Sequence, residues 1–227
     1  MIKKNNVLVV IPARSGSKGI KNKNIKIIKG KPLFFHTIDY AKKSKIVDNI
    51  ILSTDSKKYA KMAERYGLEV PFLRPQNISQ DYIQDFYVIK HALVNAENYY
   101  KKKFNLIVLL RPTSPFREHG LIEKSISLLI NNIHSTSVRS VYKVSEHPYR
   151  SWIKKDKFIT GFVNDVFEPF NIPRQKLPKI YFQSGDIETV KRKTLLKGSV
   201  NGKKVIPLII KKKSLDIDSK DDLKKIK

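Results

Sequence analysis

Short apolar runs separated by segments of helical periodicity constrain the fold of this 227-residue chain more than any other feature. The runs are Val7–Ile11 (VLVVI), Asn49–Thr54 (NIILST) and Leu106–Leu110 (LIVLL). Runs of this length that lack polar alternation are typical of strands buried on both faces. Strands that alternate with helices predict an α/β fold, a mostly parallel twisted sheet with helices on both faces.

The remaining elements follow from periodicity and from capping residues. A helix is predicted over Pro32–Lys43 with proline at its first position, and another over Lys57–Tyr66, ended by Gly67. Asp81 is predicted to cap a long helix from Tyr82 to about Lys103, in which apolar residues recur every three or four positions. The other predicted elements are a short strand at Glu69–Leu73, a helix at Gly120–Asn131 and a strand at Ser137–Val144.

Residues 145–182 break this rhythm, because they are rich in proline and aromatic residues. One interpretation is a hairpin arm that closes a ligand pocket or contacts another subunit, and the other is an irregular loop under the sheet. An ordinary domain rarely carries so long a loop without a purpose, which favours the arm. Residues 1–227 are therefore predicted to form a single domain with this segment as an inserted arm.

Composition narrows the classes of partner. The formal net charge of +26 favours anionic partners, although lysines scattered along the whole chain are also compatible with a general compositional bias. The absence of cysteine excludes disulfides and thiolate metal sites. No apolar run approaches the roughly 18 residues of a membrane-spanning helix, so a cytoplasmic protein without a membrane partner is expected. A nucleic-acid-binding protein would need a basic stripe with stacking aromatics or a groove-reading module, and no such pattern appears.

Ligands of such sheets bind beyond the carboxyl ends of the strands, so the loops after Ile11, Thr54 and Leu110 are predicted to line a site. In the first loop, residues 11–24 (IPARSGSKGIKNKN), two glycines let the backbone approach a ligand, and its amides could bind phosphate oxygens. The spacing matches neither a Walker loop nor GxGxxG, and a flexible basic surface loop is the alternative. The polar groups of this loop are those of Arg14, Ser15, Ser17, Lys18, Lys23 and Asn24.

The segment after the third strand, residues 109–117 (LLRPTSPFR), combines stiffening prolines with hydroxyl and guanidinium groups. Such a rigid edge could recognise a base or bind phosphate, and the alternative is a purely structural loop. Near the C-terminus, in residues 215–223 (LDIDSKDDL), Asp216 and Asp218 would share one face of an extended segment and could bind Mg²⁺. The alternative is a solvated pair. Ser219 is predicted to cap a last helix.

These motifs together resemble the acylneuraminate cytidylyltransferases, the CMP-sialic acid synthetases. Residues 11–24 resemble the family's nucleotide-binding signature, and residues 109–117 resemble its second nucleotide segment. Residues 173–187 (PRQKLPKIYFQSGDI) resemble the stretch near its sugar site, and residues 215–223 its metal-binding aspartate segment. The resemblance implies a Rossmann-like nucleotidyltransferase fold, a Mg²⁺ cofactor and a homodimer with an exchanged arm.

The resemblance also implies a reaction in which CTP and an acidic nine-carbon (nonulosonic) sugar give a CMP-sugar and pyrophosphate. It implies catalytic roles for Arg14, Lys23, Asp216 and Asp218, the two aspartates being the metal ligands. The positions it implies for nucleotide binding are Arg14, Ser15, Gly16, Ser17, Lys23, Asn24, Arg74, Arg111, Pro112, Thr113 and Ser114. Those it implies for sugar binding are Arg150, where the family often has a cation for the sugar carboxylate, and Arg174, Gln175, Gln183, Ser184 and Gly185.

Two departures from the family's common sequence concern substrate recognition. Arg111 stands where LLQPTSP has glutamine, and residues 184–188 read SGDIE in place of NGAIY. Legionaminic- and pseudaminic-type sugars are therefore as compatible with the sequence as N-acetylneuraminate. A guanylyl- or cytidylyltransferase that acts on a sugar phosphate is the alternative enzyme. The implied mechanism is attack of the sugar's anomeric hydroxyl on the α-phosphorus, aided mainly by positioning and charge neutralisation, and the sequence indicates no general base.

Overall fold

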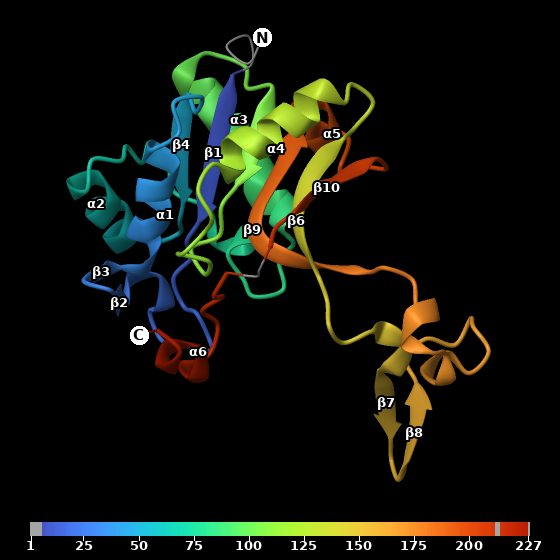
Figure 1. The fold of residues 1–227 in the computed structure, drawn as a ribbon. Coiled ribbons are helices and arrows are strands. Elements are labelled where there is room, and N and C mark those ends of the chain that lie inside the picture. The colour runs from blue at the N-terminus through green and yellow to red at the C-terminus, as the bar shows by residue number, and fades with distance from the viewer. Residues whose placement is uncertain (1–5, 212–213, 227) are drawn as a thin grey trace.

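The computed structural model describes residues 6–211 and 214–226. Its centre is a six-stranded sheet of order β10-β6-β9-β5-β1-β4, in which only β9 runs antiparallel to its neighbours (Figure 1). The strands of this sheet are β1 (Val7–Pro12), β4 (Asn49–Ser53), β5 (Leu106–Leu109), β6 (Ser137–Lys143), β9 (Tyr181–Lys191) and β10 (Val205–Ile209). The predicted mostly parallel sheet is confirmed.

Helices cover both faces because the side chains of β1 alternate between two hydrophobic clusters. Val7, Val9 and Ile11 pack with residues of α1, α2 and α4, whereas Leu8 and Val10 pack with residues of α3 and α5. The helices are α1 (Leu33–Lys42), α2 (Lys57–Arg65), α3 (Asp85–Tyr100), α4 (Leu121–Asn131), α5 (Arg192–Leu196) and α6 (Lys220–Lys224). The predicted α/β architecture is confirmed. No helix within the described residues is long and apolar enough to cross a membrane.

Two predictions in the N-terminal half of the chain are wrong: the start of one helix and the existence of one strand. α1 begins at Leu33, so Pro32 is its N-cap, because Pro32 belongs to β3 (Lys31–Pro32), which pairs with β2 (Ile27–Ile28). No strand forms at residues 69–73. This segment instead leads to Arg74, whose backbone N–H donates to the carbonyl of Thr54 at 2.7 Å.

The predicted cap of the long helix is also wrong. α3 begins at Asp85, has Gln84 as its N-cap and ends at Tyr100. Asp81 therefore caps no helix, because its carboxylate forms ion pairs with Arg14 and Lys18 instead. At the C-terminal end, the predicted cap of α6 is confirmed, since the hydroxyl of Ser219 accepts from the backbone N–H of Asp222.

Residues 145–180 form an arm that projects from the body between β6 and β9 (Figure 1). It contains a hairpin of β7 (Trp152–Lys155) and β8 (Phe158–Gly161), whose residues are almost all exposed. The segment is thus a projecting arm and not a loop packed under the sheet, and its predicted contact with a ligand pocket or another subunit stays a prediction. The exposed large hydrophobic side chains of the arm are Trp152, Ile153, Phe158, Ile159, Phe162 and Phe167.

Candidate functional site

A cavity of about 380 Å³ lies beyond the carboxyl ends of β1 and β5. The loop after β1 and the segment after β5 both line it, as predicted from the topology. The loop after β4 contributes indirectly, because Asp55 accepts hydrogen bonds from the backbone N–H and hydroxyl of Ser15 at 2.7 and 2.6 Å. Residues between Arg74 and Asp85, together with Asp218, complete the lining.

The glycines of the first loop serve two purposes. Gly16 has φ +69°, a backbone conformation that side chains disfavour. At Gly19, a Cβ atom would lie 2.5 Å from the carbonyl oxygen of Asp218, so only glycine permits this approach to the C-terminal segment. The side chain of Asn24 ties the loop together by donating to the carbonyl of Arg14 at 2.9 Å. Specific contacts thus hold the loop against the C-terminal segment, and its role in nucleotide binding stays a prediction.

Three cations of this loop, Arg14, Lys18 and Lys23, are paired with carboxylates that line the same cavity. Arg14 and Lys18 both contact Asp81, with Lys18 Nζ 2.8 Å from the carboxylate. Lys23 Nζ lies 2.6 Å from Asp218. The hydrogen bond from Lys18, aided by the charge of Arg14, holds the pKa of Asp81 below its usual value. A phosphate group is negatively charged and offers oxygen acceptors, as a carboxylate does. These cations can therefore exchange their aspartate partners for phosphate oxygens.

Arg74 differs from the other cations that line the cavity, because two of its side-chain nitrogens have no hydrogen-bond partner among the described residues. It is only 5% exposed, and these two atoms, Nε and Nη2, are buried. Burial lowers the pKa of this guanidinium, while the charge of Asp55 acts in the opposite direction. Buried polar groups are normally hydrogen-bonded, so unpaired donors beside a cavity indicate an anionic ligand. Only the family resemblance had pointed to this residue.

Some residues of the second predicted segment, residues 109–117, line the cavity, and others lie in the protein interior. Arg111, Pro112 and Thr113 line the cavity, whereas Ser114 is fully buried and its hydroxyl has no partner among the described residues. The carbonyl of Thr113 accepts from the backbone N–H of Ile217 at 2.8 Å, which joins this segment to the C-terminal one.

Arg117 has a structural position. Its side chain is buried and donates to the carbonyl of Asp186 at 2.5 Å, to the hydroxyl of Thr37 at 3.2 Å and to the carbonyl of Arg111. Burial lowers its pKa to about 10. Arg117 therefore holds residues 109–117 against β9 through these hydrogen bonds, and it does not line the cavity.

Asp216 and Asp218 do not share one face. The segment that carries them forms no strand, and Asp218 lines the cavity, whereas Asp216 lines a second cavity with Asp186 and Asp222. Within the described ranges, no three His, Cys, Asp or Glu side chains come together as a metal site. Mg²⁺ often binds through one or two carboxylates and substrate phosphates, and Asp216 Oδ1 is buried without a partner. Asp218 alone lies beside the candidate phosphate site and fits such a one-carboxylate ion site, whereas Asp216 does not reach the same cavity. The metal site stays a prediction.

The predicted sugar-side residues of β9 lie at a bulge. Gln183 pairs with Val141 and Glu188 pairs with Arg139, so the four residues 184–187 of β9 lie opposite the single residue Ser140 of β6. Gly185 has φ +79° and forms the turn of this bulge. Ser184 is buried and donates to the hydroxyl of Ser140 at 2.7 Å, so its role within one chain is structural.

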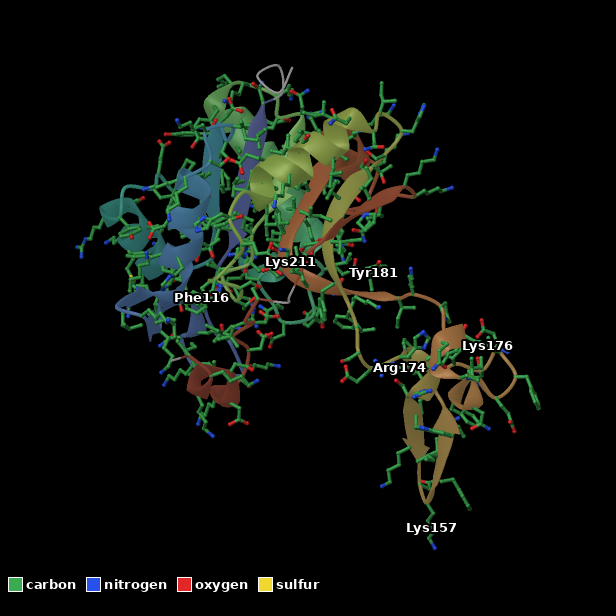
Figure 2. The ribbon with its side chains drawn as sticks, in the orientation of Figure 1. Phe116, Lys157, Arg174, Lys176, Tyr181 and Lys211 are labelled. Atoms are coloured by element: carbon green, nitrogen blue, oxygen red, sulfur yellow. The ribbon has the colours of Figure 1, made fainter. Side chains whose placement is uncertain are left out.

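The predicted sugar-binding residues of the arm are not brought to the cavity by their own chain. Arg174 lies in the arm, away from the body that carries Phe116 (Figure 2). Gln175 follows it in the same turn, and the guanidinium of Arg150 reaches the arm carbonyl of Ile172 at 3.4 Å. These three positions remain predictions.

The carboxylates that organise the site were not predicted from the sequence. Asp55, Asp81 and Asp85 were not assigned to it, although Asp55 directly follows a buried strand, which was a usable signal. Asp81 was interpreted as a helix cap, because an aspartate just before a segment of helical periodicity is a common N-cap.

The sequence of this chain is similar to those of known cytidylyltransferases. A family model described as cytidylyltransferase matches residues 8–151. The chain is 33% identical over 221 residues to the post-translational flagellin modification protein B of Campylobacter coli, covering 96% of this chain and 92% of the relative. It is 33% identical to the CMP-N,N'-diacetyllegionaminic acid synthase of Legionella pneumophila, covering 95% and 92%. It is 32% identical to the N-acylneuraminate cytidylyltransferase of Streptococcus agalactiae, covering 95% of this chain but 51% of that relative.

Two solved structures share the fold. A CMP:2-keto-3-deoxy-manno-octonic acid synthetase in complex with CTP superposes with a TM-score of 0.70 at 15% identity, covering 97% of this chain and 96% of the other. The 4-diphosphocytidyl-2C-methyl-D-erythritol synthase of Anaerococcus prevotii superposes with a TM-score of 0.64 at 16% identity, covering 98% and 96%. At these identities the likeness concerns the fold, and it confirms the predicted nucleotidyltransferase fold.

Proposed function

Because the chain belongs to the cytidylyltransferase family, we propose that it transfers CMP from CTP to an acidic nonulosonic sugar. In this reaction the oxygen of the sugar's anomeric hydroxyl forms a bond to the α-phosphorus, the bond from that phosphorus to the β-phosphate oxygen breaks, and the hydroxyl proton is released. The products are a CMP-sugar and pyrophosphate. Relatives that are named as synthases of CMP-activated legionaminic and sialic acids support this class of acceptor.

The unpaired guanidinium of Arg74 is the observation that carries the proposal. A buried charge without a partner destabilises the protein, so its retention beside a cavity indicates that a ligand supplies the missing acceptors. Arg14, Lys18 and Lys23 surround the same space and can bind further phosphate oxygens once Asp81 and Asp218 release them. A triphosphate supplies enough oxygens for all four residues.

The residues of the cavity would act by positioning and by charge neutralisation. The N–H donors of Arg74 and Arg14 would hold phosphate oxygens, and Lys23 would neutralise the charge that develops on the leaving pyrophosphate. Asp218, together with the phosphates of the substrate, would hold Mg²⁺, which would supply Lewis-acid polarisation of those phosphates when bound. Asp216 lines the neighbouring cavity and would not reach the same ion in this arrangement. The hydrogen bond that the backbone N–H of Ser15 donates to Asp55 keeps this part of the loop in place.

We further propose a homodimer in which each arm completes the partner's acceptor pocket, in a cytoplasmic enzyme. The arm presents many exposed aromatic and aliphatic side chains, and such apolar patches are typical of protein interfaces. Arg150 and Arg174 belong to this arm, so an exchanged arm would place their guanidinium groups beside the other subunit's cavity. Sedimentation analysis of the intact chain should give a dimer, and a monomer would contradict this arrangement.

Product mass spectrometry tests the proposed reaction. The protein, CTP and Mg²⁺ are incubated with a panel of nonulosonic acids and, in parallel, with sugar 1-phosphates and other nucleotides. A CMP-sugar from at least one nonulosonic acid is expected. Efficient turnover of a neutral sugar phosphate without turnover of any nonulosonic acid would overturn the acceptor class and favour the alternative nucleotidyltransferase.

Arg150→Lys tests how the acceptor carboxylate is recognised. Arginine binds a carboxylate through two parallel hydrogen bonds that lysine cannot reproduce, so the KM of the acceptor should rise although the charge is retained. The matched control is Lys157→Arg at the tip of the hairpin (Figure 2), which should leave this KM unchanged. A change of less than about twofold for Arg150→Lys would place Arg150 in an ordinary surface contact.

A further inference from the structure

A further cavity, of about 630 Å³, lies between α4 and α5, at the end of the sheet opposite to the nucleotide cavity. Asn105 and Leu106 line it at the amino end of β5, whereas the nucleotide cavity lies beyond the carboxyl end of that strand. The end of α4 forms one wall, and residues 191–197 form the other (Figure 1). The volume of this α4–α5 cavity is within the range of about 300–1,000 Å³ that is typical of sites for small ligands.

Aliphatic side chains contribute to both walls of the α4–α5 cavity. Leu106 and Leu129 are buried, whereas Ile133 and Leu196 are 79% and 41% exposed. Removal of such exposed aliphatic surface from water is favourable. The walls therefore suit a ligand with an apolar body.

The α4–α5 cavity is also more basic than the chain as a whole. Four of its ten lining residues are lysine or arginine, which is twice the frequency of 46 in 227 for the whole sequence. Among the described residues, no carboxylate lines it. Arg192 pairs with Glu97, but within residues 6–211 and 214–226 no carboxylate lies within 4 Å of the ammonium groups of Lys191, Lys193 and Lys197.

Local contacts fix where these three lysines lie. Lys191 Nζ donates to the carbonyl of Ile133 at 2.8 Å, so its ammonium joins the two walls. Burial lowers the pKa of Lys191, because its ammonium is partly removed from water without a compensating charge. Lys193 and Lys197 lie one helical turn apart, since the backbone N–H of Lys197 donates to the carbonyl of Lys193 at 3.2 Å. Like charges at this spacing repel each other, and an anion bound between them would offset that repulsion.

The combination of apolar walls and unpaired cations selects among possible occupants. A symmetric contact between two copies of this face would bring the four cations of one copy against the same four of the other, which is unfavourable. A neutral apolar ligand would remove water from the ammonium groups without providing an acceptor, which is also unfavourable. A ligand with an aliphatic body and an anionic head avoids both costs.

We propose that the α4–α5 cavity binds a small amphipathic anion, an aliphatic chain that ends in a carboxylate or a phosphate group. The chain would lie against Leu106 and Ile133, and the head group would accept hydrogen bonds from Lys191, Lys193 and Lys197. This site is separate from the nucleotide cavity, and the proposal does not depend on the proposed transfer of CMP.

Calorimetric titration of the intact protein with dodecanoate and with dodecyl phosphate, each below the concentration at which it forms micelles, tests the proposal. Saturable binding of at least one of them is expected, and the tighter of the two identifies the head group. Dodecyltrimethylammonium, which has the same chain and the opposite charge, should bind at least about tenfold more weakly. The NMR signals of backbone amides in residues 129–133 and 191–197 of the wild type should shift on titration, which locates the site without any substitution.

The double variant Lys193→Gln, Lys197→Gln tests the role of the cations. Both side chains are exposed, so the fold should be retained, and the Kd of the anion should rise at least about tenfold. The matched control is Lys154→Gln, Lys155→Gln, two exposed lysines of β7 beside the exposed Ile153, which should leave the Kd unchanged.

Three results would overturn the proposal. The first is that neither anion binds, and the second is that the dodecyl ammonium ion binds as tightly as the anions. The third is that both double variants weaken binding equally, or that the amide shifts occur elsewhere, because the attraction would then come from the general positive charge of the chain.

Discussion

Replacing Arg74 by methionine should have opposite effects on stability and on ligand binding. Methionine retains much of the length of the side chain but removes the guanidinium, whose Nε and Nη2 atoms are buried without partners. An unsatisfied buried polar group costs about 1–3 kcal/mol, and methionine does not carry that cost. A domain of 150–250 residues gains about 2–4 °C in Tm per kcal/mol, so the ligand-free variant should melt a few degrees higher than the wild type.

The same substitution should weaken the binding of CTP strongly. A hydrogen bond to a charged group contributes roughly 1.5–3 kcal/mol, and Arg74, which lines the cavity, has two buried nitrogens without partners among the described residues. About 1.4 kcal/mol corresponds to a factor of ten in Kd, so the loss of one such bond between the ligand and the guanidinium should weaken binding at least about tenfold. Calorimetric titration with CTP measures the affinity, and thermal unfolding of the ligand-free protein measures the stability.

Arg192→Met is the matched control for this substitution. Arg192 donates to both carboxylate oxygens of Glu97, at 2.7 and 2.9 Å, far along α3 from the cavity. Its loss should lower the Tm and leave the affinity for CTP unchanged. If Arg74→Met instead lowered the Tm and left the affinity for CTP intact, Arg74 would be a structural residue, and the main argument for the proposed function would fail.

Three further predictions concern the C-terminal segment, the loop and the buried carboxylate. Asp218→Asn should abolish Mg²⁺-dependent turnover while the thermal unfolding curve stays close to that of the wild type; full activity at saturating Mg²⁺ would contradict this role. Gly19→Ala should displace the segment that carries Asp218, since the added Cβ meets a backbone oxygen at 2.5 Å, and should lower kcat/KM for CTP, whereas Gly30→Ala should not. Burial alone raises the pKa of Glu97, but the hydrogen bonds from Arg192 and Phe104 outweigh it and leave the pKa below 4.5. Glu97 therefore stabilises the fold above about pH 4.5 and loses this contribution as the pH falls, so Glu97→Gln should flatten the acid decline measured by urea unfolding at pH 3–6.

The parts of the fold that could be predicted are those in which a short stretch of sequence indicates one type of element. A short apolar run such as Val7–Ile11, followed by a glycine-containing loop, is typical of a strand buried on both faces. β10 was not predicted, because Pro207 argues against a strand, yet proline is tolerated there since β10 is at the edge of the sheet. β9 was not predicted either. Polar residues such as Asp186 and Glu188 interrupt its apolar pattern, and only their tertiary partners make them compatible with the interior.

The part of the site that lies directly after the strands could be predicted, because the topology of the sheet alone determines its place. The loops after β1 and β5 meet at one edge of a parallel sheet, so Arg14 and Arg111 were assigned to the same place from spacing. Asp81 and Asp85 reach that place through the irregular segment before α3, whose path depends on packing across the whole domain. No periodicity in the sequence encodes such a path, and for that reason the pairing of cations with carboxylates was not foreseen.

The net charge of the chain is a poor guide to the charge of its cavity. The formal charge is +26, yet the cavity is lined by five lysines and arginines and by three aspartates, which leaves a modest positive excess. A triphosphate that displaced Asp81 and Asp218 from their cations would bring still more negative charge into this space. A divalent cation at Asp218 would offset that charge, so the proposed Mg²⁺ requirement follows from the balance of charge in the cavity. CTP should accordingly bind the wild type far more weakly when Mg²⁺ is removed by chelation, and equal affinity with and without Mg²⁺ would show that the protein's own cations suffice.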